Sequence, residues 1–185
     1  MTFDLGRHYL DDTIVQFHRV KQQAERAMAQ VSDEQLFVAL DPEANSIATI
    51  VKHIAGNLRS RWTEFLTTDG EKADRHRDRE FVVDADDTRP ALVAAWESGW
   101  RCLFDALAAL QPADLGRSVT IRGEPHTVVE AIHRQLAHQS YHSGQIVFLA
   151  KHFLSERWQT LTIPRGKSAE FNVRMERQFG DTRQL

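Results

Sequence analysis

The chain has 185 residues, close to the size of one ordinary domain, and 42% of its side chains are apolar while 26% are charged. This balance is typical of a compact soluble protein, and it excludes disordered, collagen-like and membrane-spanning chains. The formal net charge of -3 gives no domain-wide positive field that could hold a phosphate backbone, so nucleic-acid binding is disfavoured. We therefore expect a single domain over residues 1–185.

The expected location is the cytoplasm. The first residues, MTFDLGRHYLDD, mix acids, bases and aromatics where a secretory signal needs a continuous apolar segment. The single cysteine, Cys102, cannot form an internal disulfide, which agrees with a reducing compartment. No apolar run approaches the roughly 20 residues that cross a bilayer, so no membrane partner is expected.

Four long segments carry helical periodicity and none shows sustained period-2 alternation, which predicts an all-α fold. The first helix is expected over residues 4–30. The second opens at Asn45 or Ser46, since either is a good N-cap, and Gly70 is its natural stop.

A charged connection over residues 71–88 follows the second helix. At about 3.3 Å per residue it can run the full length of a bundle, so the second and third helices can be parallel neighbours. The apolar residues 81–83 within it indicate a short strand. The third helix is expected from Pro90, which suits a first helical turn, to Leu110.

The last third of the chain is expected to hold a hairpin and two helices. Alternation followed by Gly and Pro over residues 118–126 predicts a small hairpin. Thr127 can cap a fourth helix that reaches Phe153, and Ser168 can cap a short final helix that ends at Gln178.

Three of the nine histidines stand out by position. His138 and His142 are four residues apart and therefore share one face of the fourth helix, and His53 flanks the apolar stripe of the second. Three neutral imidazoles that converge on a divalent cation leave coordination positions open for water or substrate. The plainer interpretation of the spacing is a surface or hydrogen-bonded pair. Gln139 replaces the glutamate of the zinc-protease motif, so a zinc protease is excluded.

Several neighbouring residues allow two interpretations. Gln145 could hydrogen-bond a ligand imidazole or tie two helices together, and Asn57 could orient His53 or bond water or a neighbouring helix. Gly144 predicts a close approach of another helix or loop, because glycine costs about 1 kcal/mol against alanine in a helix. The pattern indicates no general base, and the catalytic residues stay unknown.

Two segments carry a resemblance to a known family. HQSYHSGQIVFLAKH, which begins at His138, resembles the last core helix of the DinB/YfiT-like superfamily of metal-dependent enzymes, and SIATIVKHIAGNLRSRW, around His53, resembles its second helix. The tail WQTLTIPRGKSAEFN is similar to a subgroup catalogued as a domain of unknown function. The resemblance covers nearly the whole chain, and by similarity the metal ligands are His53, His138 and His142.

The resemblance implies a four-helix bundle in up-down-down-up order, with the long connection as crossover and the hairpin and last helix as additions. It also implies a homodimer and a divalent metal, with zinc or nickel before iron or manganese. Activities in the superfamily include transfer of low-molecular-weight thiols such as bacillithiol, mycothiol-dependent isomerisation and hydrolysis. The leading hypothesis is therefore a metal-dependent enzyme that acts on a small-molecule substrate, by thiol transfer or by hydrolysis. The alternative is a non-catalytic metal-binding protein or a dimerising scaffold.

Overall fold

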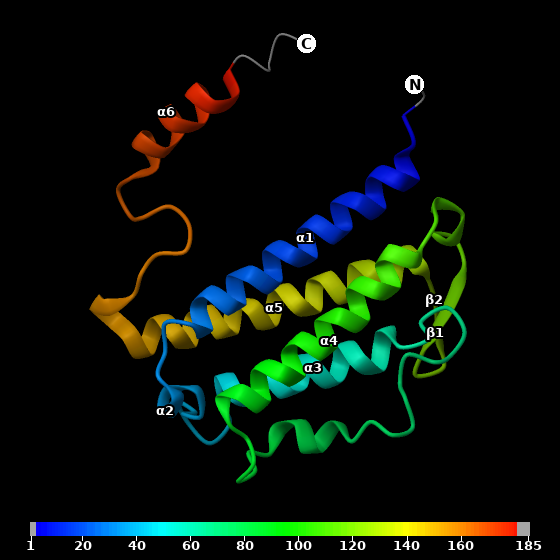
Figure 1. Cartoon of the computed structure of the whole chain (residues 1–185), viewed down its shortest axis with the longest axis horizontal. Helices are drawn as coiled ribbons and strands as arrows, with labels where there is room; N and C mark the ends of the chain where they lie inside the picture. The colour runs from blue at the N-terminus through cyan, green and yellow to red at the C-terminus, as the bar shows by residue number, and fades with distance from the viewer. Residues whose placement is uncertain (1–2, 181–185) are drawn as a thin grey trace.

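The structure is a computed structural model that describes residues 3–180, so residues 1–2 and 181–185 of the expected domain lie outside it. Within this range the fold is mostly helical, as predicted, and four long helices lie side by side (Figure 1). They are α1 (Leu5–Met28), α3 (Ile47–Trp62), α4 (Arg89–Ala109) and α5 (Val128–Leu154).

Shorter elements connect or extend these helices. They are α2 (Asp33–Leu36), the 3-10 helices η1 (Arg77–Phe81), η2 (Pro112–Asp114) and η3 (Ser155–Arg157), the antiparallel strands β1 (Ser118–Ile121) and β2 (Glu124–Thr127), and α6 (Ser168–Phe179). The hairpin is confirmed, and it lies at one end of the bundle beside the end of α3 (Figure 1).

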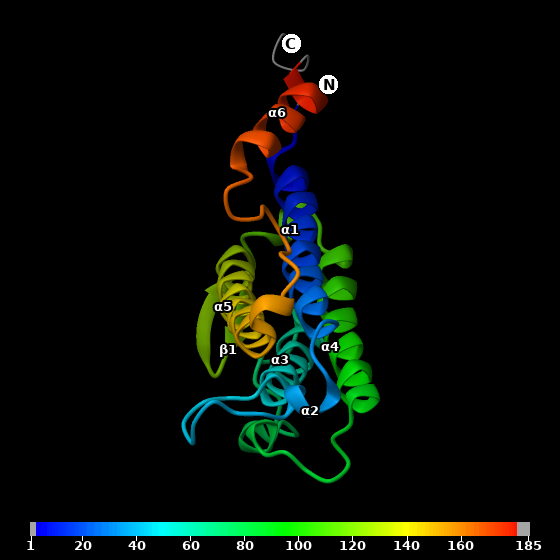
Figure 2. The ribbon, with the colours of Figure 1, turned by 90° about the vertical axis from the view of Figure 1, so that its left-hand side faces the viewer.

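The four long helices surround one apolar core. α3 packs against α4 and α5, and α1 packs against α5 and α4. Figure 2 accordingly shows α5 and α4 on opposite sides of α1 and α3. In Figure 1, α3 and α4 run in the same direction, and α1 and α5 run in the opposite one. Trp96, Trp100 and Phe17 are among the largest fully buried side chains.

A glycine allows α3 and α4 to approach each other closely. A Cβ added to Gly99 on α4 would lie 2.9 Å from the backbone of Ala55 on α3. Because real Cβ atoms do not approach backbone so closely, only glycine fits there. This contact fixes the spacing of the two helices and so the position of α3, which carries His53.

Polar caps set where the helices begin. The side chain of Ser46 accepts a hydrogen bond from the backbone N–H of Thr49, which selects Ser46 over Asn45 as the cap of α3. Thr127 and Glu130 form a reciprocal capping box at the start of α5, as the sequence predicts for Thr127. Helix α5 ends one residue beyond the expected Phe153.

Two expectations about the middle of the chain are wrong. Helix α3 ends at Trp62 rather than near Gly70, because Thr63 is extended and Glu64 has a φ of 49°, which no helix can continue. The short strand expected at residues 81–83 is absent from the described chain. Phe81 instead ends η1, and the following valines are exposed without a pairing partner strand.

The C-terminal helix also differs from the prediction. Its cap position is Lys167 rather than Ser168, and it continues to Phe179. None of its residues is buried, and it stands apart from the bundle in Figure 1. No helix among residues 3–180 is both long and apolar enough to cross a bilayer.

Candidate metal centre

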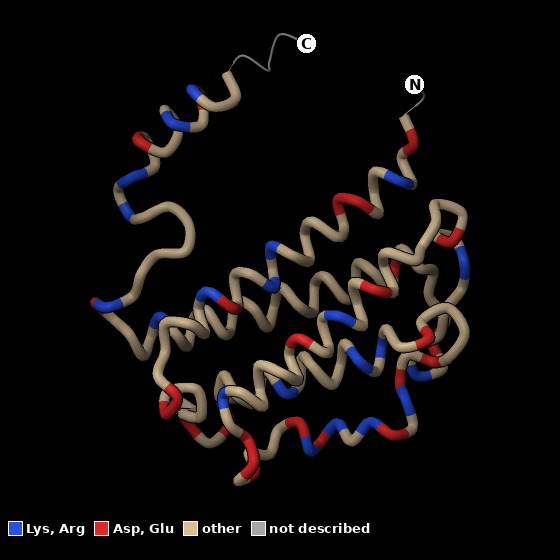
Figure 3. The backbone as a smooth tube through the Cα atoms, in the orientation of Figure 1, with Lys and Arg blue, Asp and Glu red and all other residues tan. Residues whose placement is uncertain are grey.

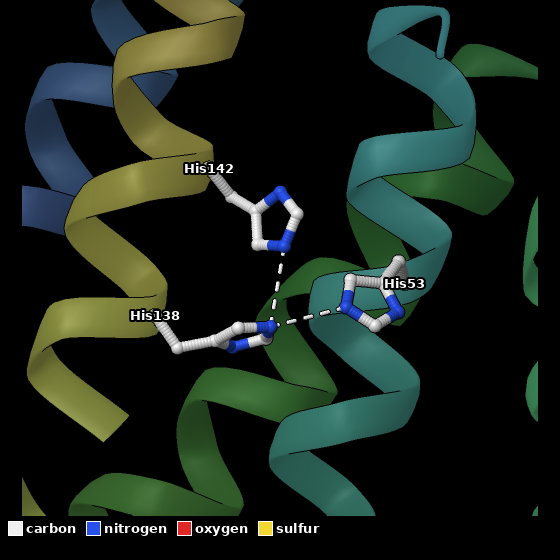
Figure 4. Close-up of side chains that lie close together, drawn as sticks. All are labelled: His53, His138 and His142. Carbon is white, nitrogen blue, oxygen red and sulfur yellow. Dashed lines mark hydrogen bonds between the residues drawn. The ribbon is translucent and has the colours of Figure 1, made fainter. Parts of the chain in front are cut away.

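Three histidine rings meet between α3 and α5 (Figure 4). His53 projects from α3, and His138 and His142 project from successive turns of α5. The Nε2 atom of His138 lies 3.2 Å from Nε2 of His53 and 3.2 Å from Nε2 of His142. The candidate ligand nitrogens of the three residues all lie within 4.8 Å of one another. The structure therefore brings together the three residues that the sequence singled out.

These separations fit one shared cation. Zinc-bound imidazole nitrogens lie about 2.0–2.1 Å from the metal, and a tetrahedral angle then places two such nitrogens ~3.3 Å apart. The observed distances of 3.2 Å are close to this value. The cluster could therefore hold a metal ion, and three protein ligands would leave a coordination position open.

Hydrogen bonds to the opposite ring nitrogens orient two of the histidines. Nδ1 of His53 donates to Oε2 of Glu80 over 2.8 Å, and Nδ1 of His142 donates to Oε1 of Gln145 over 2.7 Å. A carboxylate and an amide oxygen only accept hydrogen bonds, so each partner places the ring proton on Nδ1 and leaves a lone pair on Nε2. A proton on Nε2 of His138 can be donated to Nε2 of only one of the other two histidines. With that proton on Nδ1 instead, three lone pairs converge, and one cation would satisfy all of them at once.

Glu80 is held in place by an arginine, and a glycine on α3 leaves space for its carboxylate. Arg75 donates from Nε to Oε1 over 2.8 Å and from Nη2 to Oε2 over 3.0 Å. A Cβ on Gly56 of α3 would lie 2.2 Å from Oε1, so only glycine leaves space for the carboxylate. Burial opposes ionisation of Glu80, but hydrogen bonds from His53 and Arg75 outweigh it and lower the pKa below the ordinary value. Glu80 is therefore an anion beside His53.

Burial favours the neutral form of the α5 histidines. Desolvation, together with the nearby charges of His142, His53, Arg61 and Arg75, lowers the pKa of His138 to about 3. Desolvation also lowers the pKa of His142, although the hydrogen bond with Gln145 opposes that shift. Both rings are neutral at pH 7, and neutral imidazole is the form that ligates metals.

The structure decides how the neighbouring residues Gln145, Asn57 and Gly144 are to be interpreted. Gln145 bonds a candidate ligand imidazole, as one interpretation proposed. Asn57 accepts a hydrogen bond from Nε2 of Gln135 on α5 over 3.0 Å, which agrees with a tie between helices. The prediction for Gly144 is wrong, because a Cβ there would meet no described atom within 4 Å. This face of α5 is open in the described chain.

Sequence reasoning missed Glu80 and Arg75. Both belong to the charged connection, whose composition resembles that of a solvated loop. A weak signal existed, because Glu80 is the acid directly before the apolar residues 81–83, and that change of composition suggests contact with the bundle. The phenyl ring of Phe81 lies over His53, with ring centroids 5.1 Å apart.

The fold and the site define a mostly helical protein with a candidate three-histidine metal centre. The chain belongs to the family described as Protein of unknown function (DUF1572), whose model matches residues 4–167. The matched region includes the three histidines and Glu80, and it ends just before α6. No curated protein and no solved structure matches the chain.

Proposed function

We propose that this protein is a divalent-metal-dependent enzyme that acts on small molecules by thiol transfer or by hydrolysis, through His53, His138 and His142. The observation that carries the proposal is the position of the histidine cluster at the wall of a cavity. His53 and His138 both line a cavity of about 240 Å³, slightly smaller than the roughly 300–1,000 Å³ of most small-molecule sites, so a compact ligand would fit there. A buried structural site would have no such access.

Each residue around the cluster has a role in this proposal. His53, His138 and His142 would hold the cation, Glu80 fixes the ring of His53, and Gln145 fixes that of His142. When bound, a divalent cation lowers the pKa of a water or thiol in an open coordination position, and so supplies a nucleophile at neutral pH. The cavity beside His53 and His138 would orient the substrate toward that position.

The choice between thiol and water depends on the resemblance to the DinB/YfiT-like superfamily. The parallel course of α3 and α4, joined by a long connection, supports the proposed up-down-down-up bundle of that superfamily (Figure 1). On this basis we propose zinc or nickel before iron or manganese, a low-molecular-weight thiol as co-substrate, a homodimer and a cytoplasmic location.

The experiment compares metal content and turnover in the same preparations. Purified protein is analysed for metals, treated with a chelator and reloaded with zinc or nickel. It is then assayed with bacillithiol, cysteine or water as nucleophile against an electrophilic aryl halide and a panel of esters. We expect turnover that requires the metal and is lost in His138→Ala. His133→Ala, which changes another histidine of α5 that packs on Tyr9, is the matched control and should stay active.

The outcomes separate the alternatives. Stoichiometric metal without turnover of any substrate would favour a non-catalytic metal-binding protein. Equal metal content in the wild type and in His138→Ala would contradict the three-histidine site and leave the dimerising scaffold as the remaining hypothesis.

A further inference from the structure

The cavity beside the histidine cluster is lined by an unusual number of positively charged side chains. Five of its lining residues are arginines, namely Arg61, Arg75, Arg77, Arg122 and Arg134. Among the described residues that line it, none is Asp or Glu. The whole chain has a formal net charge of -3, so general basicity of the protein does not explain this cluster.

The arginines come from separate parts of the fold. Arg61 lies on α3, Arg75 and Arg77 lie in or next to η1, Arg122 lies in the turn of the hairpin and Arg134 lies on α5. Figure 3 shows basic residues along the connection and near the hairpin, where these segments come close to the end of α3. Tertiary structure thus gathers five guanidinium groups at one opening, although the sequence has no basic run there.

The inner arginines are fixed by carboxylates outside the cavity wall. Arg61 and Arg75 have side chains that are only 10% and 4% exposed. Glu71 accepts from Arg61 Nη1 over 2.8 Å, from Arg75 Nη1 over 3.3 Å and from Arg122 Nε over 3.1 Å. Glu71 therefore accepts from three guanidinium groups, and Glu80, which also accepts from His53, is a second carboxylate partner of Arg75. The side chain of Arg122 is 53% exposed, so this arginine stays accessible to a ligand anion. The inner part of the cavity has an excess of positive charge.

The outer arginines are weakly paired and half exposed. Arg134 lies 3.3 Å from the exposed carboxylate of Glu124 and 3.1 Å from Nε2 of His126, and Arg77 lies 3.9 Å from the fully exposed Asp78. Exposed ion pairs of this kind contribute little to stability, so a ligand anion can replace the carboxylate at little cost. Arginine forks match the two oxygens of a carboxylate or phosphate in a bidentate manner.

We propose that this cavity binds an anionic group of the substrate, a carboxylate or a phosphate on a small organic molecule, and that Arg122 and Arg134 determine this specificity. The identification of the ligand as substrate rests on the proposed function, whereas anion binding itself does not require the metal. A neutral or cationic substrate would remove water from these guanidinium groups without offering them a negatively charged partner, which is unfavourable. The small cavity volume favours a compact acid over a polyanion.

The test measures anion binding without turnover. Chelator-treated protein at low ionic strength is titrated calorimetrically with inorganic phosphate and with malonate, and chloride serves as the reference anion. We expect saturable binding of at least one probe, weakened tenfold or more in Arg134→Gln and in Arg122→Gln. Arg59→Gln, on the exposed side of α3, is the matched control and should bind like the wild type. Arg134→Lys should recover part of the affinity, because it restores charge but not the fork.

Two further arms separate this inference from the metal proposal. His142 does not line the cavity, so His142→Ala should lose metal while it keeps anion binding. Anion binding in a protein that takes up no metal would support the cavity and refute the proposed metal function. Binding that requires the metal and is equal in the arginine variants would show that the anion ligates the cation, and so overturn the inference. Absence of binding to both the metal-free and the metal-loaded protein would overturn it as well.

Discussion

Replacing Glu80 by glutamine changes one charge and almost nothing in size. In the wild type, Oε2 of Glu80 accepts from Nδ1 of His53 over 2.8 Å, and Arg75 donates to both carboxylate oxygens. A glutamine oxygen can still accept from His53, but its amide group then points N–H donors at the guanidinium of Arg75. The change therefore removes at least one hydrogen bond and the negative charge that makes His53 a stronger ligand.

The expected effect on metal binding follows from the position of Glu80 behind a ligand. Loss of such a partner weakens metal affinity by about 10–100-fold, which corresponds to ~1.4–2.8 kcal/mol. The fold should also lose stability, because Arg75 is buried and, among residues 3–180, keeps only Glu71 as an anionic partner. Removal of one partner of a buried pair costs about 3–5 kcal/mol when nothing replaces it, so with Glu71 present we expect about 3 kcal/mol or less.

The assay is a competition titration of zinc between the protein and a chromophoric chelator at neutral pH. Asp78→Asn is the matched control, because it removes the same charge from the same 3-10 helix at a fully exposed side chain. We expect Asp78→Asn to bind zinc like the wild type. Equal zinc affinity of Glu80→Gln and the wild type, with the fold intact by circular dichroism, would refute the role given to Glu80.

Two other predictions concern the support of the site and its protonation. Gly56→Ala should push the Glu80 carboxylate away from His53 and weaken zinc binding to a similar degree as Glu80→Gln. Gly144→Ala, at a position that faces open space, is the control: it should leave zinc affinity unchanged and stabilise the helix by up to about 1 kcal/mol. Equal zinc affinities of the two glycine variants would contradict this prediction. In the metal-free protein, burial lowers the pKa of His138 to about 3, against about 6.5 in the unfolded chain. Between these two pH values the unfolded chain binds one more proton than the folded protein. The free energy of unfolding should therefore fall as the pH drops from 6.5 toward 3. Urea unfolding at pH 6.5 and pH 5 measures this fall in the free energy of unfolding. The fall should be smaller in His138→Ala than in His152→Ala, which changes an exposed histidine. An equal fall in both variants would show that His138 is not desolvated.

The sequence predicts the two helices that carry the histidines and the faces those residues share. Spacing of four places His138 and His142 one above the other, and the caps Ser46 and Thr127 set where α3 and α5 begin. These are local properties, so periodicity and capping chemistry suffice to find them. The hairpin is local for the same reason, with Gly123 at a φ of 75° in its turn.

The surroundings of the site could not be predicted because they depend on contacts between distant segments. Glu80 reaches His53 only because the connection after α3 folds back along that helix, where Gly56 leaves space. The early end of α3 depends on the backbone of Glu64, and no residue type there demands a positive φ. The cost of a helical glycine likewise did not show whether Gly144 faces another helix or open space.

X-ray absorption at the zinc edge of the zinc-loaded protein can show whether the three imidazoles bind one cation. We expect one zinc per chain with three imidazole nitrogens at about 2.0–2.1 Å and at least one exchangeable light ligand. In His142→Ala, the imidazole count should fall and zinc should bind more weakly. A zinc spectrum without imidazole scattering, or one unchanged by His142→Ala, would show that zinc does not bind at these three histidines.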